Sequence, residues 1–320
     1  MPSLYPLLLR PEFAERPWGA RDLSPIYPGP RCEKPVGEVW LTGDENRVVN
    51  GPLAGRTLGQ LCREYGRALV GESARETERF PLLIKFLFPR AKLSVQVHPD
   101  DEAARSVGQL CGKTECWYVL AAEPGAQVAL GLKPGVTREQ LARAIEEVRA
   151  EELLNWVEIH AGEMIYVDAG TVHTIGPGSI LVETQQNSDT TYRLYDYGRP
   201  RQIHVEQGLE AAKERTRAGK VKRNDRATTL VASPSFLVEK FGLCQRRRFE
   251  AAHSPQIFLA LDGAGAAESP GGAAVSFAPG DALVVPAAVG QVGIRPHQDL
   301  EMLRMTLPSE PMLEPETILG

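Results

Sequence analysis

Three short segments of the chain carry side chains whose types and spacing suit a divalent metal ion. The first is the run Ser94-Val95-Gln96-Val97-His98, where a glutamine and a histidine stand two residues apart on an apolar, strand-like segment. Side chains two apart on a strand point to the same face, so Gln96 and His98 are expected to share a partner. Glu115 and His173 lie further along the chain and could complete the set. Two imidazoles, a carboxylate and an amide would leave open positions for a substrate, which is typical of a catalytic metal site.

The elements that must position these side chains are mostly β-strands. Glycine and proline separate short apolar runs along the chain, a pattern typical of an all-β protein. The clearest runs are 38–41, 93–97, 117–120, 127–130, 164–167, 180–183, 229–232, 236–241, 257–261, 282–286 and 300–306. Two helical insertions are expected, at 57–69 and 137–156, and the second begins with a capping-type Thr137-Arg138-Glu139-Gln140.

An internal similarity indicates two related halves. Residues 161–170 resemble residues 279–288, and each stretch has the order turn, strand, turn. The first copy is followed by His173, whereas the second is followed by Val289-Gly290-Gln291 and supplies no ligand. We therefore expect a metal site in the first half alone.

Composition excludes several classes of function. The formal net charge of −5 gives no general attraction for nucleic acid or anionic membranes. No apolar run approaches the roughly 20 residues that span a bilayer, and five cysteines at irregular spacing argue against a disulfide framework. We expect a cytoplasmic protein that binds a small molecule, with no evident obligate protein partner. The basic stretch 213–226 has no interleaved aromatic residues and is interpreted as a solvated linker.

The spacing Gly-x5-Asp-Ala-x3-His of residues 162–173, together with ligands two apart on an earlier strand, resembles the signature of the cupin barrel. This resemblance implies a bicupin with short helical insertions, that is, two double-stranded β-helix or jelly-roll barrels. The implied divisions are a catalytic metal-binding cupin domain at residues 1–212, a basic linker at 213–226, and a degenerate C-terminal cupin domain without metal ligands at 227–320.

Longer motifs resemble those of the type I mannose-6-phosphate isomerases. They span residues 16 to 210, and so many ordered blocks rarely match by chance. The motifs are Arg16-Pro17-Trp18-Gly19, Gly37-Glu38-Val39-Trp40, Pro81-Leu82-Leu83-Ile84-Lys85-Phe86, Ser94-Val95-Gln96-Val97-His98-Pro99-Asp100, Gly112-Lys113-Thr114-Glu115-Cys116-Trp117-Tyr118 and the segment from Glu183 to Arg193. The resemblance implies an enzyme that interconverts mannose 6-phosphate and fructose 6-phosphate by moving a proton between C2 and C1.

The same resemblance implies a role for individual residues. The implied metal ligands are Gln96, His98, Glu115 and His173. The implied catalytic residues are Lys113, Glu183 and Arg193, and the implied substrate-binding residues are Lys85, Ser94 and Arg193. The expected cofactor is one divalent ion, Zn²⁺ by resemblance, although this donor set also suits Fe, Ni, Co or Mn. The chain has Gly112 where some longer members of the family carry a histidine, so no role of that histidine is expected here.

Several alternatives stay open at this point. Lys113 and Glu183 are both candidate proton carriers, and a cation beside Lys113 is expected to favour its neutral form. Arg193 and Lys85 both suit a phosphate group. The chain could instead be a cupin isomerase or epimerase of another phosphosugar, or a non-catalytic sugar-phosphate-binding regulatory protein. Retention of the polar residues argues against the regulatory protein.

Overall fold

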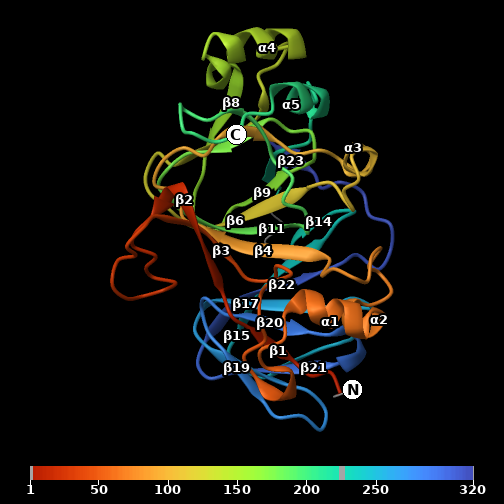
Figure 1. Cartoon of the computed structure of the whole chain (residues 1–320). Coiled ribbons are helices and arrows are strands. Elements are labelled where there is room, and N and C mark those ends of the chain that lie inside the picture. Colours follow the sequence, from red (N-terminus) through yellow and green to blue (C-terminus); the bar gives the residue numbers. More distant parts are fainter. Residues whose placement is uncertain (1–2, 223–227, 320) are drawn as a thin grey trace.

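The computed structural model describes residues 3–222 and 228–319, and most of its regular structure is antiparallel β-sheet (Figure 1). The prediction of a mainly β protein is confirmed. The predicted strands 164–167, 229–232 and 300–306 coincide with β9, β14 and β22, and the other predicted strands overlap observed ones. Glycine and proline separate many of these strands because neither residue favours a strand interior, although Pro17, Gly19 and Gly242 lie within strands.

Two sheets that come mainly from the first part of the chain enclose one apolar core. Side chains of both sheets, such as Trp117, Val128 and Leu181, meet in this core. The larger sheet contains, in spatial order, β2 (Glu12–Ala20), β3 (Val36–Trp40), β4 (Leu82–Leu87), β11 (Ser179–Gln186), β6 (Glu115–Ala122), β9 (Met164–Val167), β13 (Gly219–Val221) and β23 (Thr317–Ile318). The smaller sheet contains β12 (Tyr192–Tyr195), β5 (Val95–Val97), β10 (His173–Ile175), β7 (Gln127–Leu132) and β8 (Leu154–Glu158).

Two further sheets come mainly from the C-terminal part of the chain. They share a second core that includes Phe258, Leu283 and Met302. One sheet contains, in spatial order, β1 (Leu7–Leu9), β20 (Ala282–Val285), β17 (Gln256–Asp262), β22 (Leu300–Thr306), β15 (Leu237–Leu243) and β14 (Thr229–Ala232). The other contains β16 (Arg247–Phe249), β21 (Val292–Pro296), β18 (Gly265–Glu268) and β19 (Val275–Phe277).

The largest apolar cluster joins the two parts of the molecule. It contains Phe86 and Val182 from the eight-stranded sheet together with Val238, Ile257 and Met305 from the six-stranded sheet. Figure 1 shows these two sheets stacked one above the other. The ends of the chain cross the junction, because β1 pairs with β20 and β23 pairs with β13.

The helices are short and lie outside the sheets. The α-helices are α1 (Leu58–Tyr65), α2 (Arg67–Val70), α3 (Asp101–Ser106), α4 (Arg138–Glu146) and α5 (Val205–Ala211), and the 3₁₀ turns are η1 (Gly51–Leu53), η2 (Ala150–Leu153) and η3 (Ala287–Val289). The predicted capping box is confirmed, since Thr137 accepts a hydrogen bond from the backbone N–H of Gln140. None of the described helices is long and apolar enough to cross a membrane.

Three expectations about local structure were wrong in detail. The helix expected at 137–156 ends at Glu146, and Trp156 lies in β8. Val148 has a φ of +58°, a left-handed conformation that ends the helical path. The first expected helix is divided at Gly66, where φ is +48°. The stretch interpreted as a solvated linker contains β13, which pairs with β9 and β23, while its residues 223–226 lie outside the described part of the chain.

One glycine brings a strand close to the predicted site. A Cβ atom on Gly19 would lie 2.3 Å from the carbonyl carbon of Val36, so only glycine allows β2 to approach β3 this closely. Trp18, the preceding residue, is 2% exposed. Residues Arg16 and Trp18 of the same motif are thereby held at the cavity described below.

Candidate active site

The four expected metal ligands come together in one cluster, in which His98, Glu115 and His173 are buried and Gln96 is half-buried. His98 Nε2 lies 3.6 Å from Glu115 Oε2, and His173 Nε2 lies 3.4 Å from Glu115 Oε1. Gln96 Nε2 lies 3.2 Å from His173 Nε2. The sheet fixes this arrangement, because Gln96 of β5 is the register partner of His173 of β10. Val95 and Val97 point the other way into an apolar core, as strand alternation requires.

Both imidazoles are oriented through their second nitrogen. His98 Nδ1 lies 2.9 Å from the carbonyl oxygen of Thr190, and His173 Nδ1 lies 2.9 Å from that of Thr171. A carbonyl can only accept, so each Nδ1 carries the proton and each Nε2 presents a lone pair to the cluster. Burial lowers the pKa of both histidines, that of His173 to about 4, so both are neutral at pH 7. Backbone carbonyls orient metal-binding histidines in the same way.

The donor set fits a divalent cation. Metal–ligand bonds of about 2.0–2.2 Å place neighbouring ligand atoms roughly 3 to 3.5 Å apart, close to the 3.4 and 3.6 Å that separate the histidine Nε2 atoms from the carboxylate oxygens of Glu115. Within residues 3–222 and 228–319, one group of three or more His, Cys, Asp or Glu side chains lies close enough together to hold a metal ion. It consists of His98, Glu115 and His173. No cysteine belongs to this group.

Two further polar side chains, Lys113 and Glu183, contact the cluster. Lys113 Nζ lies 2.8 Å from Glu115 Oε2, 3.1 Å from His98 Nε2 and 3.4 Å from Glu183 Oε1. Burial disfavours the ammonium of Lys113, but the carboxylates of Glu115 and Glu183 outweigh it and raise the pKa of Lys113. The protein groups alone therefore keep this lysine charged, and the expected neutral form requires the charge of a bound cation.

Glu183 is placed by the centre of the eight-stranded sheet. On β11 it is paired in register with Lys85 of β4 on one side and Trp117 of β6 on the other. Burial raises its pKa to about 7, although the positive charges of Lys85 and Lys113 oppose this shift. A carboxyl group with a pKa near neutrality can both accept and donate a proton at physiological pH.

Lys85 belongs to a second buried charge network. Its Nζ donates a hydrogen bond to Gln185 Oε1 at 3.0 Å, lies 4.0 Å from Glu38 Oε2 and stands 4.7 Å from the ring centroid of Trp40. Glu38 also accepts two hydrogen bonds from Arg16 at 3.0 Å. Burial opposes ionisation of Glu38, but Lys85 and Arg16 prevail and lower its pKa to about 2. Lys85 is thus a fixed, buried cation beside the cluster.

The cluster and this network line the same cavity, which has a free volume of about 100 Å³. Ser94, which precedes β5, and Arg193 of β12 also line it. All the predicted site residues line this cavity except His98 and His173. Both histidines lie close to Glu115, which is a lining residue. The lining residues are Arg16, Trp18, Glu38, Lys85, Leu87, Leu93, Ser94, Gln96, Lys113, Glu115, Trp117, Ile175, Glu183, Asp189, Thr191, Arg193 and Arg201.

The sequence did not single out several lining residues. Trp18 and Trp117 lie in motifs that were recognised; each is at least 98% buried, and each lines the cavity. Arg16 and Glu38 lie in motifs that were recognised, but no role was assigned to them. Arg201 carried no signal, because it follows β12 in an irregular segment and reaches the cavity only through the fold.

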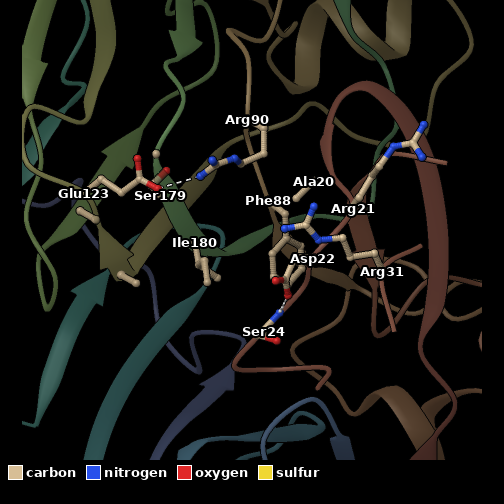
Figure 2. Close-up of a pocket in the computed structure, with 13 residues that line it drawn as sticks. Ala20, Arg21, Asp22, Ser24, Arg31, Phe88, Arg90, Glu123, Ser179 and Ile180 are labelled. Atoms are coloured by element: carbon tan, nitrogen blue, oxygen red, sulfur yellow. Dashed lines mark hydrogen bonds and ion pairs between the residues drawn. The ribbon is translucent and has the colours of Figure 1, made fainter. Parts of the chain in front are cut away.

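A larger hollow of about 490 Å³ lies elsewhere on the surface (Figure 2). Its charged side chains are exposed, and Figure 2 shows Arg90 turned toward Glu123, to which it donates a hydrogen bond of 2.7 Å. No histidine lines it. It lacks the buried, mutually perturbed titratable groups that mark active sites, so the cavity beside His98 and His173 is the candidate active site.

The backbone around Gly112 leaves no room for a side chain at the position before Lys113, where some longer members of the family carry a histidine. A Cβ atom on Gly112 would lie 2.5 Å from the carbonyl carbon of Asp100 and 2.7 Å from Pro99 O. These are backbone atoms directly after His98 and cannot turn aside. We expect Gly112→Ala to destabilise the fold by about 1–3 kcal/mol and to reduce activity by displacing His98, as measured by urea unfolding and turnover.

Gly242→Ala is the matched control for this substitution. Gly242 lies on β15, and a Cβ atom added there would have no neighbouring atom within 4 Å. Its substitution should therefore change stability by no more than about 0.5 kcal/mol. Equal stability and activity of the two variants would show that the 99–101 backbone yields readily, and the steric account of Gly112 would be wrong.

Comparison with known proteins places this cavity in a family context. Residues 8–130 match the family model described as phosphomannose isomerase type I, catalytic domain. The mannose-6-phosphate isomerase ManA of Bacillus subtilis (strain 168) is 36% identical over 305 residues, which cover 89% of this chain and 94% of that protein. The mannose-6-phosphate isomerase of Streptococcus mutans is also 36% identical, over 74% of this chain and 78% of its own length.

Solved structures agree with the sequence relatives. The crystal structure of the mannose 6-phosphate isomerase from Bacillus subtilis superposes with a TM-score of 0.82 at 30% identity, covering 94% of this chain and 99% of that one. The enzyme from Salmonella typhimurium shares the fold at 16% identity, with a TM-score of 0.75 over 95% and 99% of the two chains. The match to ManA and the matches to both solved structures cover at least 89% of each chain. The protein is therefore an enzyme that belongs to the type I mannose-6-phosphate isomerase family.

Proposed function

We propose that this enzyme interconverts mannose 6-phosphate and fructose 6-phosphate at a metal-dependent site in the cavity. The observation that carries the proposal is the buried group of His98, Glu115 and His173, with Lys113 and Glu183 in contact with it. A metal-binding donor set and two proton carriers in one cavity are what an aldose–ketose isomerisation requires, because a carbon-bound proton must move while oxygen charge develops.

The metal would be held by Gln96, His98, Glu115 and His173. When bound it would supply Lewis-acid stabilisation of substrate oxygens or hold the sugar in place. We propose Zn²⁺ on the basis of the family resemblance, and two imidazoles with a carboxylate are compatible with a catalytic zinc site. The Ser94 hydroxyl, 3.1 Å from Gln96 Oε1, orients the amide ligand and lies close to the sugar.

Proton transfer between C2 and C1 is assigned to Lys113 and Glu183. The raised pKa of Glu183, about 7, supports a carboxyl group that exchanges protons near neutrality. Lys113 lies 3.4 Å away and can pass a proton to the same carboxylate. Arg193, whose Nε is buried without a hydrogen-bond partner, is proposed to donate to a substrate oxygen. Lys85 adds a fixed positive charge to the same cavity, which favours an anionic substrate.

The wider proposal concerns the architecture and location of the chain. Two pairs of antiparallel sheets, each around its own core, support two double-stranded β-helix barrels. We propose the divisions 1–212 and 227–320, joined by 213–226, with β1 and β23 each adding to the sheet of the opposite part. Five free cysteines support a reducing, cytoplasmic setting, and the substrate is a small sugar phosphate.

The test is an assay for fructose 6-phosphate formation from mannose 6-phosphate, before and after chelation and after restoring zinc. We expect activity to fall by at least about 100-fold on chelation and to return with the metal, because the cluster is the proposed binding site. Glucose 6-phosphate tested in parallel identifies a preference for another sugar. A fully metal-loaded enzyme that leaves both mannose 6-phosphate and fructose 6-phosphate unchanged would contradict the proposal.

A further inference from the structure

One wall of the cavity carries three arginines, from different strands and loops. Arg16, Arg193 and Arg201 all line it. Burial lowers the pKa of Arg193, and the neighbouring charges of Arg201 and Arg16 add to this shift, while the carboxylates of Asp196 and Asp189 oppose it. Like charges held close together repel, and an anion bound between them relieves that repulsion. The wall is therefore arranged to receive a negatively charged group.

A buried carboxylate fixes one of these arginines, Arg201. Asp196, 2% exposed, accepts hydrogen bonds of 2.6 Å from both Nε and Nη2 of Arg201. Paired bonds between a guanidinium and a carboxylate set the direction of the guanidinium as well as holding it. Asp196 also accepts a 3.1 Å bond from Arg199, whose Nη2 donates to the carbonyl oxygen of Lys92 at 2.8 Å. Asp196 thus ties the segment after β12 to the chain just before β5.

Arg201 keeps free hydrogen-bond donors, whereas the other cations are engaged. Its side chain is 22% exposed, and the bonds to Asp196 leave Nη1 available. Lys85 is 3% exposed and bonded to Gln185. Arg16 uses Nε and Nη2 on Glu38 and donates from Nη1 to the carbonyl oxygen of Glu15 at 3.1 Å. Arg201 is the guanidinium on this wall that combines a fixed direction, free donors and access from solvent.

The charges of the cavity also call for an anionic ligand. Five cationic side chains and four carboxylates line it, and a divalent metal would add two positive charges. A phosphate monoester carries about −1.5 to −2 charge at pH 7. A sugar phosphate would therefore leave the occupied cavity close to neutral, and its charged end fits the arginine wall.

We propose that Asp196 is a positioning residue that holds the Arg201 guanidinium on the cavity wall, where Arg201 binds the phosphate group of the substrate. This inference rests on the proposed function for the identity of the sugar, but not for the binding of phosphate. Arg193, whose strand register places it beside Gln96, stays with the reacting end of the sugar, and Arg201 takes the charged end.

Arg201→Gln tests the binding role. We expect KM for mannose 6-phosphate to rise by about 10- to 100-fold, as for loss of a charged hydrogen bond, while kcat stays within about threefold. The inhibition constant of inorganic phosphate should rise by a similar factor. Arg31→Gln is the matched control, because it removes the same charge from an exposed arginine in the separate hollow of Figure 2. Unchanged KM and phosphate inhibition in Arg201→Gln, relative to this control, would overturn the proposal.

Asp196→Asn tests the positioning role through a double-mutant cycle. Alone, it should raise KM and weaken phosphate inhibition by several fold, with kcat nearly unchanged. In the Arg201→Gln background it should cause no further loss, because its effect passes through Arg201. The same loss in both backgrounds would identify Asp196 as a general structural residue and refute its positioning role.

If Asp196→Asn fails to fold, Arg201→Lys provides a second test. This variant should recover part of the phosphate affinity that is lost in Arg201→Gln, and no recovery would count against the proposal.

Failure of the proposed function is distinguishable from failure of this inference. Titration of the wild-type and Arg201→Gln enzymes with inorganic phosphate, followed by calorimetry, needs no turnover. Weaker phosphate binding by the variant would support the inference even if mannose 6-phosphate were not the substrate. Equal phosphate binding by both, in an enzyme that converts mannose 6-phosphate, would overturn the inference and leave the proposed function intact.

Discussion

Replacing His173 with alanine is expected to release the bound metal and to lower kcat/KM for mannose 6-phosphate by at least about 100-fold. Loss of a residue that merely orients a ligand typically costs 10- to 100-fold in metal affinity or activity, and His173 is proposed as a ligand. Its Nε2 lies 3.4 Å from Glu115, and its Nδ1 is fixed by the carbonyl of Thr171. Metal content after gel filtration, measured together with the isomerase assay, checks the prediction.

His160→Ala is the matched control for this experiment. His160 is largely exposed and lies outside the cavity, near Glu158 and Glu163. The control should keep both metal and activity. His173→Ala with metal content and kcat/KM within about threefold of wild type would remove His173 from the ligand set. Partial recovery of activity at high zinc concentration would instead point to weakened binding with the remaining ligands in place.

The position of the ligands was predictable because a strand has a fixed period of two. Gln96 and His98 stand two apart, and Val95 and Val97 alternate with them, so one face is polar and the other apolar. The structure has this arrangement, with the valines in an apolar core. Lys113 and Glu115 follow the same rule and touch each other at 2.8 Å. Their roles as ligands or proton carriers stay predictions.

The cationic wall was not predictable, because no local pattern encodes it. Arg16 comes from β2, while Arg201 follows β12, and only the sheet order brings both to the same cavity. Asp196 is a carboxylate in a polar segment, which by itself indicates solvent exposure, and its burial depends on contacts with Arg199 and Arg201. Non-local charge networks of this kind leave no periodic trace in a sequence.

Short elements were missed for a related reason. Helix α3 has six residues and starts from an N-cap hydrogen bond between Asp100 and the backbone N–H of Ala103, which is too little sequence for a helical period to appear. The pairings of β1 with β20 and of β23 with β13 join segments far apart in the chain. The internal similarity predicted two halves, but it carried no information about which half each chain end would join.

The isosteric substitution Glu183→Gln is expected to lower kcat by about 10²- to 10⁴-fold, the usual contribution of a positioned acid–base group. Glutamine has the same shape but cannot take up a proton. The carboxyl group is 4% exposed, and burial raises its pKa to about 7, so the wild-type side chain exchanges protons readily near neutral pH. Lys113 keeps its contact with Glu115 in the variant, so metal content and KM should stay within a few fold of wild type.

Exchange of the C2 proton with solvent separates the two candidate carriers. Mannose 6-phosphate deuterated at C2 should lose its label in the wild-type enzyme but not in Glu183→Gln, if Glu183 removes that proton. Lys113→Met provides the comparison, and Glu123→Gln, which removes an exposed carboxylate, is the matched control. If Glu183→Gln exchanges label at the wild-type rate while Lys113→Met does not, the lysine is the base. The raised pKa of Glu183 would then reflect only its burial beside Glu115, and Glu183 would act by stabilising the ammonium that forms when Lys113 takes up the C2 proton.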